Sequence, residues 1–212
     1  MIQEEIIFWD WNGTLLNDTE TCLTTMNHML RQRNMPEISF DLYKEVFGFP
    51  VIDYYRKIGF DFKRESFEKL SIEFIEAYNL ALGSAPLARG TRRVLAYYKE
   101  MGKENIIISA MKQDMLRRSV TEKGVKDYFT TILGIENIYA ASKAQIATDF
   151  VVQHSIDVRD VVLVGDTTHD YEVAEDIGCR CILITDGHQS EERLRATGAE
   201  IVNSITDLLP GF

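Results

Sequence analysis

The stretch at residues 6–15 reads IIFWDWNGTL. Its first four residues form a continuous apolar run, whereas a strand with one solvated face would alternate apolar and polar residues. A continuous run is typical of a strand that is covered on both faces, as in a parallel sheet between helices. The run ends at Asp10, which a polar turn follows. The stretch therefore predicts a buried strand with a carboxylate at its carboxyl end.

Similar apolar runs recur along the second half of the chain. They lie at 106–108, 161–164 and 181–184, with weaker candidates at 128–133 and 199–202. Helical patterns separate them, at 91–101, 112–123, 143–154, 168–177 and 190–197. Strands that alternate with helices at this spacing predict an α/β fold, a doubly wound parallel sheet with right-handed crossovers.

The alternation is interrupted once, between residues 17 and 88. This segment shows only helical patterns, near 19–34, 41–47, 51–58 and 64–82, and it holds 11 of the 22 aromatic residues. So many aromatic side chains indicate a small core of its own. We therefore expect an α/β core formed by residues 1–16 and 89–212, with residues 17–88 inserted as a helical unit, which the resemblance described below implies is a cap.

The composition excludes several classes of protein. The chain has 212 residues and a formal net charge of −10, without a basic cluster, so nucleic acids and anionic membranes are poor partners. No apolar run reaches the roughly 18 residues of a membrane span. The start of the chain lacks the basic region of a signal peptide. We expect a cytoplasmic protein, and the sequence does not indicate its oligomeric state.

Polar residues follow several of the predicted strands. Asp10 ends the first run, Ser109 follows the second, and Asp166 and Asp170 follow the run at 161–164. In doubly wound sheets the ligand binds beyond the carboxyl ends of the strands. Carboxylates from two strands are costly to bring together without a cation between them, and aspartate oxygens suit Mg²⁺. These residues therefore predict a magnesium site.

Four motifs, in chain order, resemble those of the haloacid dehalogenase superfamily, in its Mg²⁺-dependent phosphatase branch with a helical cap. The family's Asp-x-Asp-x-Thr/Val-Leu/Val motif corresponds to Asp10–Leu15, its Ser/Thr to Ser109, its Lys at a helix start to Lys143, and its Gly-Asp-x-x-x-Asp to Gly165–Asp170. The turn at 48–50 is similar to the Gly-x-Pro of phosphoglycolate-phosphatase-like caps. The resemblance covers nearly the whole chain and implies a Rossmannoid core.

The resemblance implies hydrolysis of a small phosphorylated metabolite, such as a phosphoglycolate-like compound or a sugar phosphate. Asp10 would attack phosphorus and form an aspartyl-phosphate that water then hydrolyses. Ser109 would donate a hydrogen bond and Lys143 would supply a fixed positive charge to the transferring oxygens. Backbone N–H groups after Asp10 would hold the phosphate, with Gly13 allowing its close approach.

The implied cofactor is Mg²⁺. The resemblance assigns it to the carboxylates of Asp10, Asp166 and Asp170 and to the backbone carbonyl of Asn12. A divalent cation is needed because a carboxylate nucleophile and a phosphate dianion repel each other.

One position departs from the family pattern. The second aspartate of the first motif, the family's general acid, is Asn12 here, and an amide cannot exchange a proton at neutral pH. Four explanations stay open: a leaving group that needs little protonation, another acid such as His169 or a cap residue, a protein that only binds its ligand, or deamidation at the Asn12–Gly13 pair. A deliberate substitution that traps substrate is a further possibility.

Other functions are weaker alternatives. A catalytically impaired member would bind a phosphorylated metabolite for regulation. A dehalogenase needs no metal, which the acidic motif at Gly165–Asp170 argues against, and a phosphomutase would need an acid at position 12. Within the cap, Arg31, Arg56 and Lys57 are candidates for binding a substrate carboxylate or a second phosphate.

Overall fold

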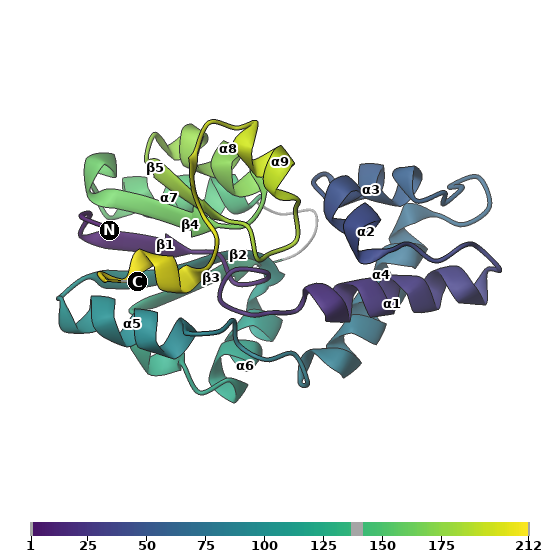
Figure 1. Ribbon diagram of the computed structural model, residues 1–212, viewed down its shortest axis with the longest axis horizontal. Helices are drawn as coiled ribbons and strands as arrows, with labels where there is room; N and C mark the ends of the chain where they lie inside the picture. Colours follow the sequence, from purple (N-terminus) through teal and green to yellow (C-terminus); the bar gives the residue numbers. More distant parts are fainter. Residues whose placement is uncertain (1, 137–141, 212) are drawn as a thin grey trace.

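A six-stranded parallel sheet forms the centre of the computed structural model, which describes residues 2–136 and 142–211 (Figure 1). Its strand order is β3-β2-β1-β4-β5-β6. The strands are β1 (Ile6–Trp9), β2 (Glu104–Lys112), β3 (Thr131–Ile135), β4 (Val161–Gly165), β5 (Arg180–Ile184) and β6 (Glu200–Val202). The direction of winding reverses between β1 and β4, the place where doubly wound sheets bind ligands.

Helices cover both faces of the sheet, which explains the continuous apolar runs. In Figure 1, α5 (Thr91–Glu100) and α6 (Gln113–Glu122) lie below the sheet, and α7 (Lys143–Gln153) and α8 (Thr168–Ile177) lie above it. Successive residues of β1 enter different cores: Ile7 and Trp9 pack with α5 and α6, while Phe8 packs with α7 and α8. The predicted α/β fold with a doubly wound parallel sheet is confirmed.

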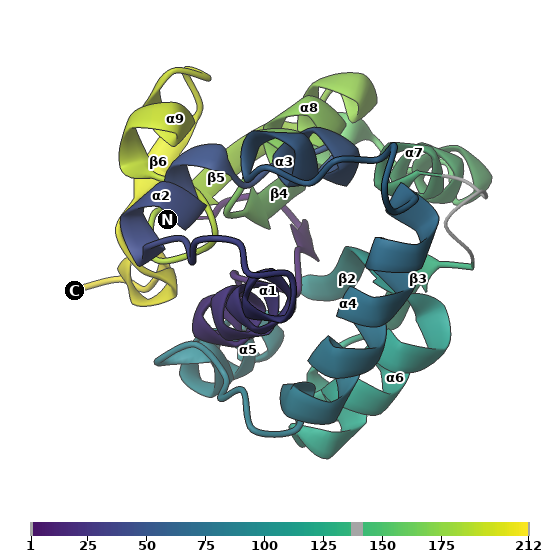
Figure 2. The same ribbon diagram turned by 90° about the vertical axis from the view of Figure 1, so that its right-hand side faces the viewer.

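The segment between β1 and α5 forms a helical lobe beside the sheet (Figures 1 and 2). Its helices are α1 (Thr19–Gln32), α2 (Phe40–Val46), α3 (Val51–Lys57) and α4 (Phe67–Leu82). They enclose a separate hydrophobic cluster that contains Met29, Tyr43, Tyr55 and Leu70. We call this lobe the cap; its division from the core at residues 16 and 88 stays a prediction.

The two chain crossings between core and cap are bonded to each other. Asn17 donates its N–H to the carbonyl of Pro86, and Ala88 donates to the carbonyl of Leu15, both at 2.9 Å. Leu16 and Leu87 form an antiparallel bridge between the same segments. The entry and exit of the cap are therefore joined immediately beyond the end of β1.

Some element boundaries differ from the predicted ones. β2 continues to Lys112, past the predicted end at residue 108, because its pairing with β3 resumes after a register shift between Ile108 and Lys112. β3 begins only at Thr131, because Lys126–Tyr128 forms a 3₁₀ turn. The last helix, α9 (Glu191–Arg195), is shorter than predicted. Two further 3₁₀ turns are Val158–Asp160 and Ile205–Leu208.

Within 2–136 and 142–211, no helix combines the length and apolarity of a membrane span.

Candidate active site

Three buried carboxylates meet at the winding reversal of the sheet. Asp10 follows β1, Asp166 follows β4, and Asp170 lies in the first turn of α8. Trp9 and Val164 are register partners, and Asp10 donates its N–H to the carbonyl of Val164 at 2.9 Å, so the ends of β1 and β4 are adjacent. One carboxylate oxygen from each of the three aspartates lies within 4.8 Å of the other two. The predicted acidic residues are thus brought together.

Lys143 is the first residue of α7, and its ammonium group bonds to two of these carboxylates. The N-cap Ser142 accepts the N–H of Gln145 at 3.2 Å, which starts the helix at this position. From there the buried Lys143 side chain donates to Asp10 and to Asp170. Burial alone would lower the pKa of Lys143, but the two carboxylates raise it, so the side chain stays charged.

The charges of the cluster do not balance with Lys143 alone. Burial, together with Asp170 and Asp166 and against the effect of Lys143, raises the pKa of Asp10 well above its usual value. Burial and the charge of Asp170 raise the pKa of Asp166 to about 6. Burial would also raise the pKa of Asp170, but the charge of Lys143 and the hydrogen bond from the Thr167 hydroxyl outweigh burial, so the pKa of Asp170 is lowered. A divalent cation among these oxygens would relieve the repulsion.

The geometry of the cluster fits such a cation. Asp166 is held in place because Thr14 Oγ1 donates to its Oδ1 at 2.9 Å and the His188 N–H donates to its Oδ2 at 2.7 Å. Asp170 Oδ2 accepts the N–H of Thr167 at 3.0 Å. Rigid aspartate oxygens are the ligands that hard divalent ions prefer. The cluster can therefore bind a divalent metal.

Gly13 is required where the loop after β1 meets Asp166. Its φ is +77°, and a Cβ at this position would lie 2.2 Å from Asp166 Oδ2 and 2.4 Å from His188 Cδ2. Its N–H donates to Asp18 Oδ1 and to the carbonyl of Leu16, both at 2.8 Å. In this structure the close approach that Gly13 allows is therefore that of Asp166 and His188, and its N–H is engaged within the chain.

Ser109 lies on the β2 side of the site. It was expected directly after a strand, but the structure places it inside β2, at the interruption of pairing between Ile108 and Lys112. The side chain is buried, and its Oγ accepts the N–H of Met111 at 3.1 Å. Ser109 lines the same cavity as Asp10 and Lys143.

Asn12 is fixed by a cap helix. Its Nδ2 donates to Asp18 Oδ2 at 2.9 Å and to the Tyr78 hydroxyl at 2.8 Å, and that hydroxyl donates to Asp18 Oδ2 at 2.6 Å. Both amide protons therefore have acceptors. The side chain at the family's general-acid position is held rigidly and has no proton to give to a leaving group.

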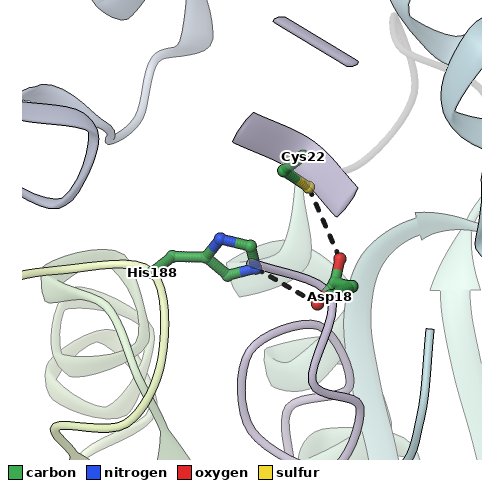
Figure 3. A group of neighbouring side chains, drawn as sticks. All are labelled: Asp18, Cys22 and His188. Carbon is green, nitrogen blue, oxygen red and sulfur yellow. Dashed lines mark hydrogen bonds and ion pairs between the residues drawn. The ribbon is translucent and has the colours of Figure 1, made fainter. Parts of the chain in front are cut away.

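Asp18 and His188 form a buried ion pair that was missed at the sequence level (Figure 3). His188 Nε2 lies 3.3 Å from Asp18 Oδ1, and the Cys22 thiol donates to Asp18 Oδ2 at 3.5 Å. Burial would lower the pKa of His188 and raise that of Asp18. Their mutual attraction reverses both effects, to about 9 for His188 and about 2 for Asp18.

A sequence signal for His188 exists. The stretch 186–188 reads Asp-Gly-His and follows the apolar run of β5, as the other site residues follow their strands. Asp18, in contrast, precedes the first cap helix, where the sequence suggests only that Asp18 or Thr19 caps the helix N-terminus. It occupies that position but makes no side-chain cap hydrogen bond, because its oxygens accept from Gly13, Asn12 and Tyr78 instead.

A cavity of about 530 Å³ lies between the core and the cap. Five of the predicted site residues line it: Asp10, Asn12, Ser109, Lys143 and Asp170. Asp166 is fully buried and does not line it, and neither does Gly13. His169 lines it with its ring 4.7 Å from that of Phe49, while its Nδ1 lies 3.2 Å from Glu172.

The basic candidates of the cap lie elsewhere. Arg31 pairs with Glu37 at 3.1 Å and Arg56 with Asp53 at 2.5 Å, and neither they nor Lys57 line the cavity. The cap surface that faces the site is instead largely aromatic.

Comparison with known proteins identifies the family. The model of the haloacid dehalogenase-like hydrolases matches residues 6–184. A phosphoglycolate phosphatase of Neisseria meningitidis is 23% identical, over 97% of this chain and 91% of its own length. A haloacid dehalogenase-like hydrolase from Streptococcus pneumoniae superposes with a TM-score of 0.85 at 16% identity, covering 98% of each chain.

A second solved structure, titled a predicted phosphoglycolate phosphatase, comes from Haemophilus somnus. It has a TM-score of 0.81 at 18% identity, with 98% of this chain and 97% of the other covered. At these identities the structural matches establish the fold alone, whereas the family model covers most of the chain. The chain therefore belongs to the haloacid dehalogenase-like hydrolase family, and the predicted enzyme class, a phosphoric monoester hydrolase, is confirmed.

Proposed function

We propose that this enzyme is a Mg²⁺-dependent phosphatase that hydrolyses a small phosphate monoester through an aspartyl-phosphate on Asp10. The observation that carries the proposal is the position of Asp10: it lines the cavity, bonds to Lys143, and has one oxygen within 4.8 Å of an oxygen of Asp166 and of Asp170. A nucleophile, a fixed positive charge and a group of carboxylates that could bind a metal therefore lie together on the core side of the cavity. The Neisseria relative, a phosphoglycolate phosphatase, supports the same reaction class.

The first step is attack by a carboxylate oxygen of Asp10 on phosphorus. The oxygen–phosphorus bond forms, the ester bond breaks, and its electron pair leaves with the alcohol oxygen. Lys143, which is buried against Asp10, donates hydrogen bonds to the transferring oxygens, and Ser109 contributes its hydroxyl proton. Water then attacks the phosphorus of the aspartyl-phosphate and regenerates the Asp10 carboxylate with release of phosphate.

The metal would be held by Asp10, Asp166, Asp170 and the carbonyl of Asn12. When bound, Mg²⁺ supplies the positive charge that lets a phosphate dianion approach these carboxylates. Asp166 contributes from behind the cavity wall, with its orientation set by Thr14 and His188. This chain's own residues then orient the nucleophile and hold the phosphoryl oxygens.

The test is release of phosphate from acetyl phosphate and p-nitrophenyl phosphate, with Mg²⁺ and with a chelator. We expect activity that depends on Mg²⁺ and is lost in Asp10→Asn, and we expect rapid quenching to leave one phosphoryl group on the native chain by intact mass. The matched control is Asp160→Asn, an exposed aspartate at the opposite end of β4. Full activity in Asp10→Asn would overturn the proposal.

A further inference from the structure

The cap side of the cavity is apolar and rich in rings. Its wall includes Phe47, Phe49, Tyr54, Phe67, Phe74 and Ile75. Phe49 and Ile75 are 40% and 38% exposed, so they lie at the surface of the cavity and not within the cap core. Such a wall favours a flat, apolar group, because aromatic pairs gain dispersion and quadrupole energy beyond the area that they bury.

The same cavity is poorly suited to a leaving group that carries its own negative charge. Each basic side chain of the described lining has an acidic partner: Lys143 bonds to Asp10 and Asp170, Lys112 lies 3.3 Å from Asp114, and His188 pairs with Asp18. His169 lies beside Glu172. A carboxylate on the leaving group would therefore have to displace an existing ion pair or stay unpaired among rings, which is costly.

The second, independent observation is the fixed amide of Asn12. Its protons are held by Asp18 and Tyr78, so the leaving group departs without a proton from this side chain. A phenol ionises near pKa 10, as the tyrosine side chain does, whereas an aliphatic alcohol ionises several units higher. A phenolate therefore leaves readily where an alkoxide does not.

We infer that the substrate is a small aryl phosphate, a phosphate monoester of a phenol, whose ring lies against the aromatic wall of the cap. This inference rests on the proposed function and names its substrate class. The Asp10 oxygen bonds to phosphorus while the aryl oxygen–phosphorus bond breaks, and the phenolate then takes its proton from water. The cavity volume of about 530 Å³ is within the usual range for small-molecule sites.

The first experiment compares substrates on the native enzyme. Ring-substituted phenyl phosphates are measured against phosphoglycolate and glycerol phosphate, with acetyl phosphate as a reactive substrate that has no ring. We expect kcat/KM for phenyl phosphate to exceed that for phosphoglycolate by at least about 100-fold, the usual contribution of a general acid. The rate should also fall steeply as the pKa of the phenol rises.

The outcomes separate the two proposals. Equal or faster hydrolysis of phosphoglycolate would overturn the substrate class while leaving a phosphatase. No hydrolysis of any compound, acetyl phosphate included, would overturn the proposed function and the substrate class together. Free O-phosphotyrosine and a phosphotyrosine peptide carry the same ring, and faster hydrolysis of the peptide would overturn the assignment to a small molecule.

The second experiment tests the wall itself. In Phe49→Ala and Ile75→Ala we expect KM for phenyl phosphate to rise about tenfold, which corresponds to the loss of one ring–ring or apolar contact, with KM for acetyl phosphate unchanged. The matched controls are Leu80→Ala and Ile72→Ala, exposed residues of the same helix as Ile75 that do not line the cavity. An equal rise for both substrates, or no rise for phenyl phosphate, would contradict the placement of the ring.

Discussion

Asn12 Nδ2 lies 2.9 Å from Asp18 Oδ2, so the residue at the family's general-acid position is hydrogen-bonded to a buried carboxylate. The contact joins the loop after β1 to the start of α1. Tyr78, on α4, the last helix of the cap, bonds to both residues through its hydroxyl group. An acid placed here would therefore have its proton shared with Asp18 and Tyr78.

The first prediction follows from that contact. In Asn12→Asp the new carboxyl would lie beside the Asp18 carboxylate, and this like charge raises its pKa and favours the protonated form. We expect kcat for alkyl phosphates to increase about 10²–10⁴-fold, the range of general acid catalysis, with a much smaller change for phenyl phosphates. Steady-state kinetics on both classes measures this difference.

The control for this prediction is Asn12→Ala. It removes the hydrogen bond to Asp18 without adding an acid, so a gain from a merely loosened loop would appear in it as well. Two outcomes would contradict the prediction: an equal increase of kcat for alkyl phosphates in Asn12→Ala and Asn12→Asp, or no hydrolysis of alkyl phosphates by Asn12→Asp. Either would show that the lack of an acid at position 12 does not limit the rate.

The second prediction concerns Lys143. Replacing it by Met keeps much of the apolar stem but leaves the buried carboxylates of Asp10 and Asp170 without their cation. We expect kcat to fall by about 10²–10³-fold, the cost of losing one preorganised donor to the developing charge. An exposed lysine of the core, Lys126, provides the control as Lys126→Met, for which kcat should be unchanged. Activity retained in Lys143→Met would remove Lys143 from the mechanism.

Much of the fold was predictable because burial on both faces of a sheet shows directly in the sequence. The run at residues 6–9 was predicted as a strand with its observed bounds, since both faces of β1 are covered by helices. β3 was weaker: most of its residues are only half-buried, and the apolar Tyr128 that precedes it belongs to a 3₁₀ turn. Because β3 lies at the edge of the sheet, its apolar run is less continuous, and the sequence predicts its bounds less well.

The candidate site was predictable only where residues follow strands. Asp10, Asp166 and Asp170 were found in this way, and the structure brings one oxygen of each within 4.8 Å of the others. The Asp18–His188 pair could not be inferred, because 170 positions separate its members and the contact forms only once the fold brings the segment after β5 to the start of α1. The apolar wall was equally hidden, since aromatic residues of a cap fill its core and line its cavity alike.

The third prediction tests the metal without relying on activity. If Mg²⁺ binds the aspartate cluster, it stabilises the folded state by about 2.7 kcal/mol at 100 times its Kd. We expect the melting temperature of the native chain to rise with Mg²⁺ and that of Asp166→Asn to respond far less. Asp160 lies directly before β4, whereas Asp166 directly follows it, so Asp160→Asn should respond to Mg²⁺ as the native chain does. An equal Mg²⁺ response in Asp166→Asn would place the metal elsewhere.

The fourth prediction concerns how the cap is held on the core. The carboxyl end of α2 accepts hydrogen bonds from the segment after β5: the Ser190 N–H donates to the Lys44 carbonyl at 3.1 Å, Gln189 donates to the Phe47 carbonyl at 3.1 Å, and Arg193 donates to both carbonyls. These last carbonyls of α2 have no partner within the helix, so the core supplies their donors. Removing Arg193 should therefore loosen the cap locally.

We expect Arg193→Ala to speed amide exchange in α2 while exchange in β1 and β4 stays slow, because the loss affects a single contact between the cap and the core. Arg195→Ala is the matched control: Arg195 lies two residues further in α9, where it pairs with Glu191 at the surface. Hydrogen exchange followed by mass spectrometry distinguishes the two variants. Similar exchange of α2 in both would show that Arg193 does not hold the cap, and faster exchange throughout Arg193→Ala would indicate general destabilisation instead.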